Sequence, residues 1–181
     1  MNPVRLLLDK LAPLAYRLQG KGWYRQLMRH FGSIRVHEAS PQEIYQSWEI
    51  IEPGSGEQSI HSNPNVTPYV GYAGKSLAGY MELVRYPDEH PLFHGYWITG
   101  LYVRTRFRGL GVGKALVQQA IKRAREENAS EIWLLVYNNR IPAVRLYQKL
   151  GFTIVSSAEI ELMLENERSG AERRILMRRL L

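Results

Sequence analysis

Hydrophobic residues along this chain follow two periods, and the changes between them divide it into predicted strands and helices. Five segments have the β-branched and aromatic content of strands and end at turn residues. The turn at Gly74-Lys75 makes a hairpin of the second and third segments. The predicted strands are residues 33–39, 69–73, 76–86, a segment from about 93 to 103, and 131–137.

Three segments have helical spacing instead. Ser40 precedes a proline and is followed three residues later by Glu43, a pattern typical of a capped helix start. Apolar residues recur every three or four positions over residues 115–124. Residues 140–150 have a proline in the first turn and a glycine directly after the last. These segments predict helices between the strands.

The remaining segments complete the predicted fold. Residues 52–68 are rich in Gly, Ser, Asn and Pro and are predicted as a loop. Residues 152–164 are predicted as a long strand, 165–170 as a polar turn and 172–180 as a returning strand. The sum is an α+β domain: a mixed, largely antiparallel twisted sheet flanked by helices. One parallel pair joins the fourth and fifth strands through a right-handed crossover helix.

A glycine-rich stretch, residues 106–114, lies between the fourth strand and the crossover helix. Glycines at 109, 111 and 113 let the backbone approach a ligand closely, and free amides at a helix start favour an anion. The stretch therefore predicts a phosphate cradle. A dinucleotide fingerprint would need glycine where Lys114 stands. A nucleoside-triphosphate loop would need glycine at Arg108 and Ser or Thr at Ala115, so the spacing excludes both.

Arg108 to Gly113 has the pattern Arg-x-x-Gly-x-Gly with one additional glycine, and it resembles the pyrophosphate loop of the GNAT superfamily of acyl-CoA N-acyltransferases. A second motif supports the resemblance. Leu146-Tyr147 is followed after three residues by Gly151-Phe152, which is similar to the end of the family's later helix. One helix and one strand separate the two motifs, as in the family.

The resemblance implies a GNAT-like fold and an N-acyltransferase that uses acetyl-CoA or another acyl-CoA as cosubstrate, without a metal. It implies that Tyr147 donates a proton to the coenzyme A thiolate; the alternative is an aromatic residue that fills the core. Asn139 stands one residue away from the family's asparagine position and could contact the coenzyme or only shape its loop. The implied coenzyme contacts are Leu101, Tyr102, Val103, Arg108, Gly109, Leu110, Gly111, Val112, Gly113, Lys114 and Asn139.

The general base departs from the family pattern. The fourth-strand positions that often carry a carboxylate hold Thr99 and Gly100 here, and the fifth-strand position corresponds to Leu134 or Leu135. Glu82, in the third strand, is the remaining carboxylate candidate, with an outward-facing or ion-paired residue as the alternative. His94, Tyr96 or a water chain are further candidates, and His61 is interpreted as an exposed loop histidine rather than an acceptor contact.

The charge is concentrated near the N-terminus. The net charge is +7, and residues 1–35 hold seven Lys and Arg side chains against Asp9 alone. Residues 1–32 also have apolar residues at helical spacing, which predicts a basic amphipathic helical extension before a domain at 33–181. The extension could pack on its own domain or form a homodimer contact, lie on an anionic membrane surface, or bind another acidic partner; nucleic acid is the less expected choice.

The chain has no cysteine, which excludes disulfides and thiol nucleophiles. No signal peptide is expected because Asp9 and Lys10 interrupt the first apolar stretch, and a cytoplasmic location follows as the expectation. Two functions remain open. One is an N-acyltransferase, with acetyl as the expected acyl group and a small-molecule or peptide amine as acceptor. The other is a non-catalytic acyl-CoA-binding or regulatory domain.

Overall fold

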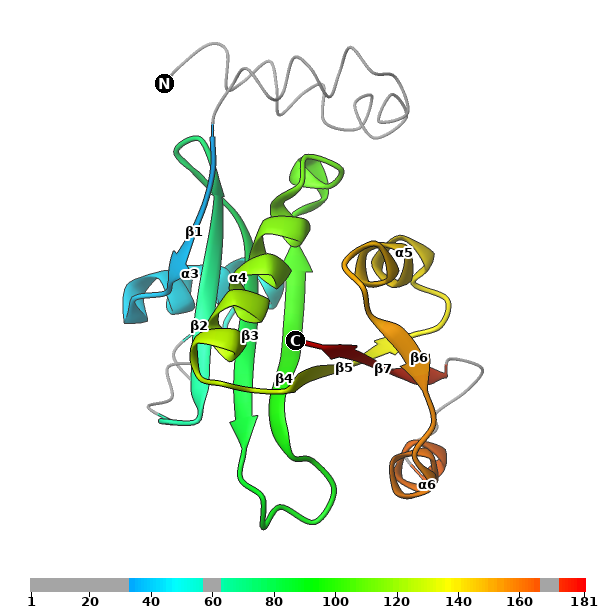
Figure 1. Cartoon of the computed structure of the whole chain (residues 1–181). Helices are drawn as coiled ribbons and strands as arrows, with labels where there is room; N and C mark the ends of the chain where they lie inside the picture. Colours follow the sequence, from blue (N-terminus) through cyan, green and yellow to red (C-terminus); the bar gives the residue numbers. More distant parts are fainter. Residues whose placement is uncertain (1–32, 57–62, 167–172) are drawn as a thin grey trace.

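A seven-stranded sheet with the strand order β1-β2-β3-β4-β5-β7-β6 forms the centre of the protein. The computed structural model describes residues 33–56, 63–166 and 173–181 (Figure 1). All neighbouring strands are antiparallel except β4 and β5, which are parallel. The predicted α+β architecture is confirmed. The strands are β1 (Ile34–Glu38), β2 (Val66–Ala73), β3 (Ser76–Tyr86), β4 (Gly95–Val103), β5 (Glu131–Tyr137), β6 (Thr153–Val155) and β7 (Arg174–Leu180).

Helices cover both faces of this sheet. The largest core cluster lies under α4 (Val112–Glu126) and α5 (Ile141–Lys149), and α4 crosses in front of β2 and β3 in Figure 1. Two smaller clusters lie under α3 (Pro41–Ile51) and α6 (Ala158–Asn166). On β3, Met81 and Leu83 belong to the large cluster and Tyr80 to the cluster under α3. Because strand side chains alternate between faces, α3 and α6 cover the face opposite α4.

The predicted capping box at the start of α3 is present. The Ser40 hydroxyl accepts from the Glu43 amide at 3.4 Å, and the Ser40 amide donates to the Glu43 carboxylate at 3.0 Å. The Glu43 carboxylate also accepts from the Tyr72 hydroxyl of β2 at 2.9 Å. The cap therefore attaches the helix to the sheet as well as starting it.

The sheet divides at β4 and β5. Only three residue pairs register the two strands, and the last is Ile98 with Leu134. Beyond it the register of β4 with β3 shifts between the pairs Tyr80–Tyr102 and Glu82–Thr99, which places an extra residue on β4 beside Gly100. Gly100 has a φ of 61°, a left-handed conformation typical of a bulge. Figure 1 shows β5 turning away from β4 past this point.

The predicted long strand over residues 152–164 is wrong. The strand ends at Val155, and Ala158–Asn166 form α6. The alternation of apolar and acidic residues in 158–165 suggested a strand, but Ile160, Met163 and Leu164 pack together against the sheet at helical spacing. The Ser157 carbonyl accepts from the Glu161 amide at 2.9 Å and begins the helix. Burial of these three side chains against the sheet therefore favoured the helical period over the strand period.

A smaller correction concerns β2, which begins at Val66 inside the predicted loop. Pro68 is part of the strand because it lies just beyond the last β1–β2 pair, Glu38 with Tyr69. Its carbonyl accepts from the Ala39 amide at 2.8 Å. The predicted basic helices of residues 1–32, and His61, lie outside the described residues. Within the described residues, no helix is both long and apolar enough to cross a membrane.

Candidate active site

The glycine-rich stretch forms a tight turn between β4 and α4. A short 3-10 helix, Thr105–Phe107, follows β4, and Phe107 anchors it in the core with 7% of its surface exposed. Gly109 and Gly111 then adopt φ values of 78° and 98°, which a side chain would strain. Gly111 is the N-cap of α4. The two glycines reverse the chain so that the helix begins beside the end of β4.

Several amides of this turn are available to a ligand. Within the part of the chain that the structure describes, the amides of Gly109, Gly111, Val112, Gly113 and Lys114 have no hydrogen-bond acceptor. The first amide of α4 that is bonded is that of Ala115, which donates to the Gly111 carbonyl at 2.9 Å. Open amides at the positive end of a 15-residue helix form an anion site. The glycine turn therefore has the geometry of the predicted phosphate cradle.

The basic side chains of the turn differ in role. The Arg108 Nε donates to the Val103 carbonyl at 3.0 Å, so this guanidinium ties the turn to the last residue of β4. Lys114 is exposed on the first turn of α4. The backbone amides, with the exposed Lys114 ammonium, are thus better placed for an anion than the Arg108 side chain.

The two sequence motifs meet at Gly113. A Cβ placed on Gly113 would lie 3.3 Å from the Leu146 side chain of α5 and 3.5 Å from the Val103 side chain of β4. The start of α4, the end of β4 and the middle of α5 therefore converge on one point. The edge of β4 that faces β5 has no strand partner over residues 99–103 within the described residues. Leu101, Tyr102 and Val103 lie along this edge.

Tyr147 follows Leu146 on α5 and lies in the large core cluster. Its side chain is only 5% exposed, and its ring packs edge-on against Phe152 at a centroid distance of 5.7 Å. Burial raises the pKa of its phenol, so the proton remains on the oxygen at neutral pH. The packing role is thus present, and proton donation stays a prediction. Asn139 lies in the exposed turn between β5 and α5.

Glu82 lies on the face of the sheet covered by α3 and α6, since Met81 and Leu83 on either side face α4. Its carboxylate accepts from the Tyr80 hydroxyl at 2.7 Å and from the Thr99 hydroxyl at 3.3 Å. Two hydroxyls thus hold a half-buried carboxylate across the β3–β4 pair. Thr99 occupies a β4 position that often carries a carboxylate in the family. Here its hydroxyl instead bonds the Glu82 carboxylate of the neighbouring strand β3.

The other base candidates are engaged elsewhere. The Tyr96 hydroxyl donates to the Glu127 carboxylate at the end of α4, and burial together with that bond raises its pKa to about 12. Tyr96 faces the large core cluster, on the side opposite Glu82. His94 is exposed, and its carbonyl accepts from the Trp97 indole at 2.9 Å.

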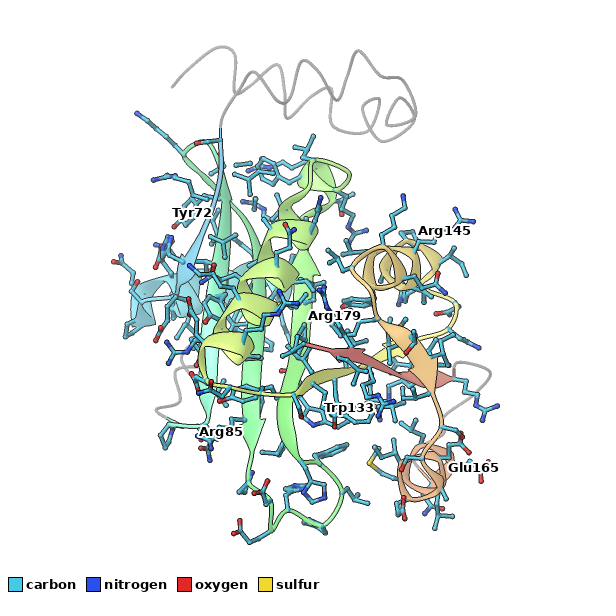
Figure 2. All side chains as sticks on the ribbon, in the orientation of Figure 1. Tyr72, Arg85, Trp133, Arg145, Glu165 and Arg179 are labelled. Carbon is cyan, nitrogen blue, oxygen red and sulfur yellow. The ribbon has the colours of Figure 1, made fainter. Side chains whose placement is uncertain are left out.

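A cavity of about 320 Å³ lies beside the division of the sheet. Thr99, Gly100 and Leu135, the first residues past the last parallel pair, line its floor. Aromatic side chains from the β3–β4 hairpin and Met163 of α6 form its walls. In Figure 2, Trp133 lies between β4 and α6, in the cluster behind this cavity. Sequence reasoning missed Met163 as a cavity residue because it predicted a strand in place of α6.

The comparison with protein families gives one match over most of the domain. The family described as "Acetyltransferase (GNAT) family" matches residues 33–152. Among curated proteins, the mycothiol acetyltransferase of Corynebacterium aurimucosum is 26% identical over 120 residues, which are 66% of this chain and 35% of that protein. The spermine/spermidine N(1)-acetyltransferase of Bacillus subtilis is 33% identical over 84 residues, which are 45% of this chain and 55% of that protein. The chain thus spans about a third to a half of the length of these relatives.

A solved structure shares the fold. It is a putative streptothricin acetyltransferase from Bacillus anthracis in complex with acetyl coenzyme A. That structure is 27% identical, aligns with a TM-score of 0.54, and covers 66% of this chain and 65% of its own.

Proposed function

Because this chain belongs to the acetyltransferase (GNAT) family, we propose that it transfers an acetyl group from acetyl-CoA to a primary amine. The observation that carries the proposal is the convergence at Gly113. Open amides of α4, the unpaired edge of β4 and the helix that bears Tyr147 meet there. A ligand with a pyrophosphate and an extended arm fits that arrangement.

The residues of the site fit this donor. The open amides of Gly109 and of Gly111 to Lys114 would hold the pyrophosphate. The backbone of Leu101 to Val103 would bond the pantetheine arm as a strand partner does. Asn139, at the start of α5, is proposed as a further contact. Acetyl-CoA supplies the activated thioester carbonyl.

Two side chains would move the protons. The amine nitrogen forms a bond to the thioester carbonyl carbon and the carbon–sulfur bond breaks. Glu82 accepts the proton that the amine loses, directly or through one water, because its carboxylate lies beside Thr99 at the edge of the cavity. Tyr147 donates its phenolic proton to the departing thiolate. The products are an amide and free coenzyme A.

The test combines binding and turnover. Acetyl-CoA is titrated calorimetrically, and thiol release is then followed over a panel of amines, amino acids, peptides and polyamines. We expect micromolar binding, and thiol release that depends on an added amine. Binding without thiol release for every amine would reject the enzyme and favour an acyl-CoA-binding domain, the reading suggested by Thr99 and Gly100 in place of a β4 carboxylate.

Glu82→Gln tests the proposed base. The amide keeps the size of the side chain and its contact with Tyr80, but it cannot accept a proton. We expect kcat to fall by about 100-fold, typical of losing a general base, with the acetyl-CoA Kd unchanged. Steady-state kinetics of Glu82→Gln are compared with those of Glu126→Gln, an exposed change on α4. A kcat within twofold of the parent enzyme would remove Glu82 from the mechanism.

A further inference from the structure

The two oxygens of the Glu82 carboxylate are bonded differently. The Tyr80 hydroxyl donates to Oε1 at 2.7 Å, and the Thr99 hydroxyl donates to Oε2 at 3.3 Å. The first distance is typical of a strong hydrogen bond to an ionised oxygen, whereas the second is longer than an ordinary bond between a hydroxyl and an oxygen. Oε1 is therefore held firmly and Oε2 only loosely.

Tyr80 is itself fixed in the core. Its side chain is 2% exposed and belongs to the cluster under α3 with Ile44 and Val70. Trp48 of α3 packs edge-on against its ring at a centroid distance of 6.0 Å. Burial, together with the Glu82 carboxylate, raises the pKa of the Tyr80 phenol, so the hydroxyl keeps its proton at neutral pH and remains a donor. A ring enclosed in this way directs its hydroxyl to one place.

The loosely held oxygen lies at the floor of the cavity beside the division of the sheet. Thr99 stands directly opposite Glu82 in the β3–β4 register, and Thr99 lines that cavity. The next residue, Gly100, forms the bulge past which β4 and β5 no longer pair. Oε2 can therefore exchange its weak hydroxyl partner for an amine or a water in the cavity, while Oε1 stays in place.

Two other ionisable side chains lie near this carboxylate. Burial, together with the Glu82 charge, raises the pKa of Tyr86 on the same strand, so its phenol stays neutral at neutral pH. Arg174 of β7 lines the same cavity and already interacts with another group of the protein. An arginine keeps its charge throughout this range. A change of activity on the acid side of neutrality would therefore come from neither of them.

We propose that Tyr80 is a positioning residue for acetyl transfer: it fixes Oε1 of Glu82 and leaves Oε2, beside Thr99, to take the proton of the amine. The inference rests on the proposed role of Glu82 as the base. The amine proton moves to Oε2, directly or through one water, as the nitrogen bonds the thioester carbonyl carbon. The carbon–sulfur electron pair leaves with the sulfur, which takes the proton of Tyr147. Tyr80 keeps its own proton throughout.

Tyr80→Phe tests the proposal in the full-length enzyme, with acetyl-CoA and the best amine of the panel described above. We expect kcat/KM at neutral pH to fall by about tenfold, with the acetyl-CoA Kd unchanged. The acid limb of the pH profile of kcat/KM should move to higher pH by about one unit, because a carboxylate that loses a hydrogen-bond donor takes up a proton more readily. An unmoved acid limb would overturn the inference even if activity fell, since a purely structural residue would not shift it.

Tyr72→Phe is the matched control. It removes a hydrogen bond of the same kind, from a tyrosine to the Glu43 carboxylate of α3, and should lower stability without moving the acid limb. Thr99→Val removes the longer bond to Glu82 and should move the limb less than Tyr80→Phe does. A shift in either variant as large as that of Tyr80→Phe would contradict the assignment.

A stronger donor should have the opposite effect. 3-Fluorotyrosine at position 80 keeps the ring and has a more acidic phenol, so the acid limb should move to lower pH. This measurement decides the question if Tyr80→Phe does not fold, and an unchanged limb would then reject the role.

A double variant separates this inference from the proposed reaction. In the Glu82→Gln background, Tyr80→Phe should change kcat by no more than about twofold, because Tyr80 acts through Glu82. A tenfold loss in both backgrounds would show that Tyr80 only supports the fold. If Glu82→Gln lowers kcat and Tyr80→Phe has no effect, this inference fails and the base remains. If Glu82→Gln has no effect, the base and this inference fail together, and absence of thiol release with every amine rejects acetyl transfer as well.

Discussion

Tyr147 combines a core position with a proposed chemical role. Its ring is enclosed by the large cluster and packs on Phe152, so the aromatic body stabilises the contact between α5 and the sheet. Its neighbour Leu146 reaches the start of α4. The hydroxyl therefore lies on the helix that contacts the start of α4. Packing uses the ring, and the proposed proton donation would use the hydroxyl.

Removing that hydroxyl separates the two roles. In Tyr147→Phe the ring contacts remain, and we expect the free energy of unfolding to change by less than about 1 kcal/mol. The turnover number should fall by about 100-fold, because no group replaces the proton donor. Urea unfolding and steady-state kinetics are measured beside Tyr45→Phe, an exposed tyrosine on α3. An unaltered kcat would leave Tyr147 with packing alone.

At the scale of elements, the close contact between α4 and the sheet depends on residues without side chains. Gly71 of β2 and Gly79 of β3 lie beneath Val112 and Leu116. A Cβ on Gly79 would lie 2.8 Å from the Tyr102 carbonyl oxygen and 3.1 Å from both helix side chains. A backbone atom cannot move aside as a side chain can, so this position sets how closely the helix that carries the glycine turn approaches β4.

Gly79→Ala is expected to lower the free energy of unfolding by about 2 kcal/mol, in the range of overpacked cores. Gly113→Ala provides the contrast. Gly113 lies within α4, and the new methyl group would lie 3.3 Å from the flexible end of the Leu146 side chain. Its cost to stability should be much smaller, since alanine favours the helix. Urea denaturation followed by circular dichroism compares the two, and equal costs would contradict this account of the packing.

The start of α3 predicts a pH dependence of stability. Burial by itself would raise the pKa of Glu43, but hydrogen bonds from the Ser40 amide, the Tyr72 and Ser40 hydroxyls and His37 lower it to about 2. The ordinary pKa of a glutamate side chain is 4.5. A lowered pKa means that the ionised carboxylate stabilises the fold above pH 4.5 and that this contribution is lost as the pH falls toward 2.

Glu43→Gln should remove most of that dependence. We expect the parent protein to lose about 2 kcal/mol more than the variant between pH 5 and pH 2.5, as the carboxylate takes up a proton. The melting temperature is followed across this range, with Glu89→Gln, an exposed change in the β3–β4 hairpin, as control. Parallel curves for Glu43→Gln and the parent would show that the network does not depress the pKa.

At the scale of the whole molecule, the two faces of the sheet have different tasks. The glycine turn, α4 and α5 occupy one face, while Glu82, the aromatic hairpin and α6 occupy the other. The division between β4 and β5 lies between them, because the pairing of these two strands ends at Ile98 and Leu134. In the proposed reaction, a donor held on one face would meet an acceptor held on the other at this division.

The GNAT family match begins at residue 33, and the large core cluster joins β1 to the C-terminal Leu181. We therefore predict that a protein lacking residues 1–32 still folds and binds acetyl-CoA with an affinity within about threefold, which calorimetry would measure. Removing the basic residues of that segment should abolish any binding to anionic liposomes, measured by co-sedimentation. It should also abolish any homodimer that depends on the segment, measured by light scattering. Aggregation of the shortened protein would show instead that the segment packs on the domain.

The sequence by itself was sufficient for the features that depend on local chemistry. The capping box at Ser40, the hairpin at Gly74-Lys75 and the glycine turn at 109–113 follow from residues a few positions apart. The family resemblance also came from short motifs at fixed spacing. Glu82 could be named as the remaining carboxylate, although nothing near it in the sequence indicates Tyr80 and Thr99 as its partners.

Only the tertiary structure decided the features that depend on distant residues. The period of residues 158–165 fits a strand or a helix, and burial of Ile160 against Trp97 selected the helix. The cavity takes residues from β3, β4, β5, α6 and β7, so no stretch of sequence contains it. β4 and β5 separate where their pairing stops. That point is settled by the bulge at Gly100 and by the pairing of β5 with β7 on its other side. Local sequence thus specified the glycine turn, whereas long-range packing formed the cavity.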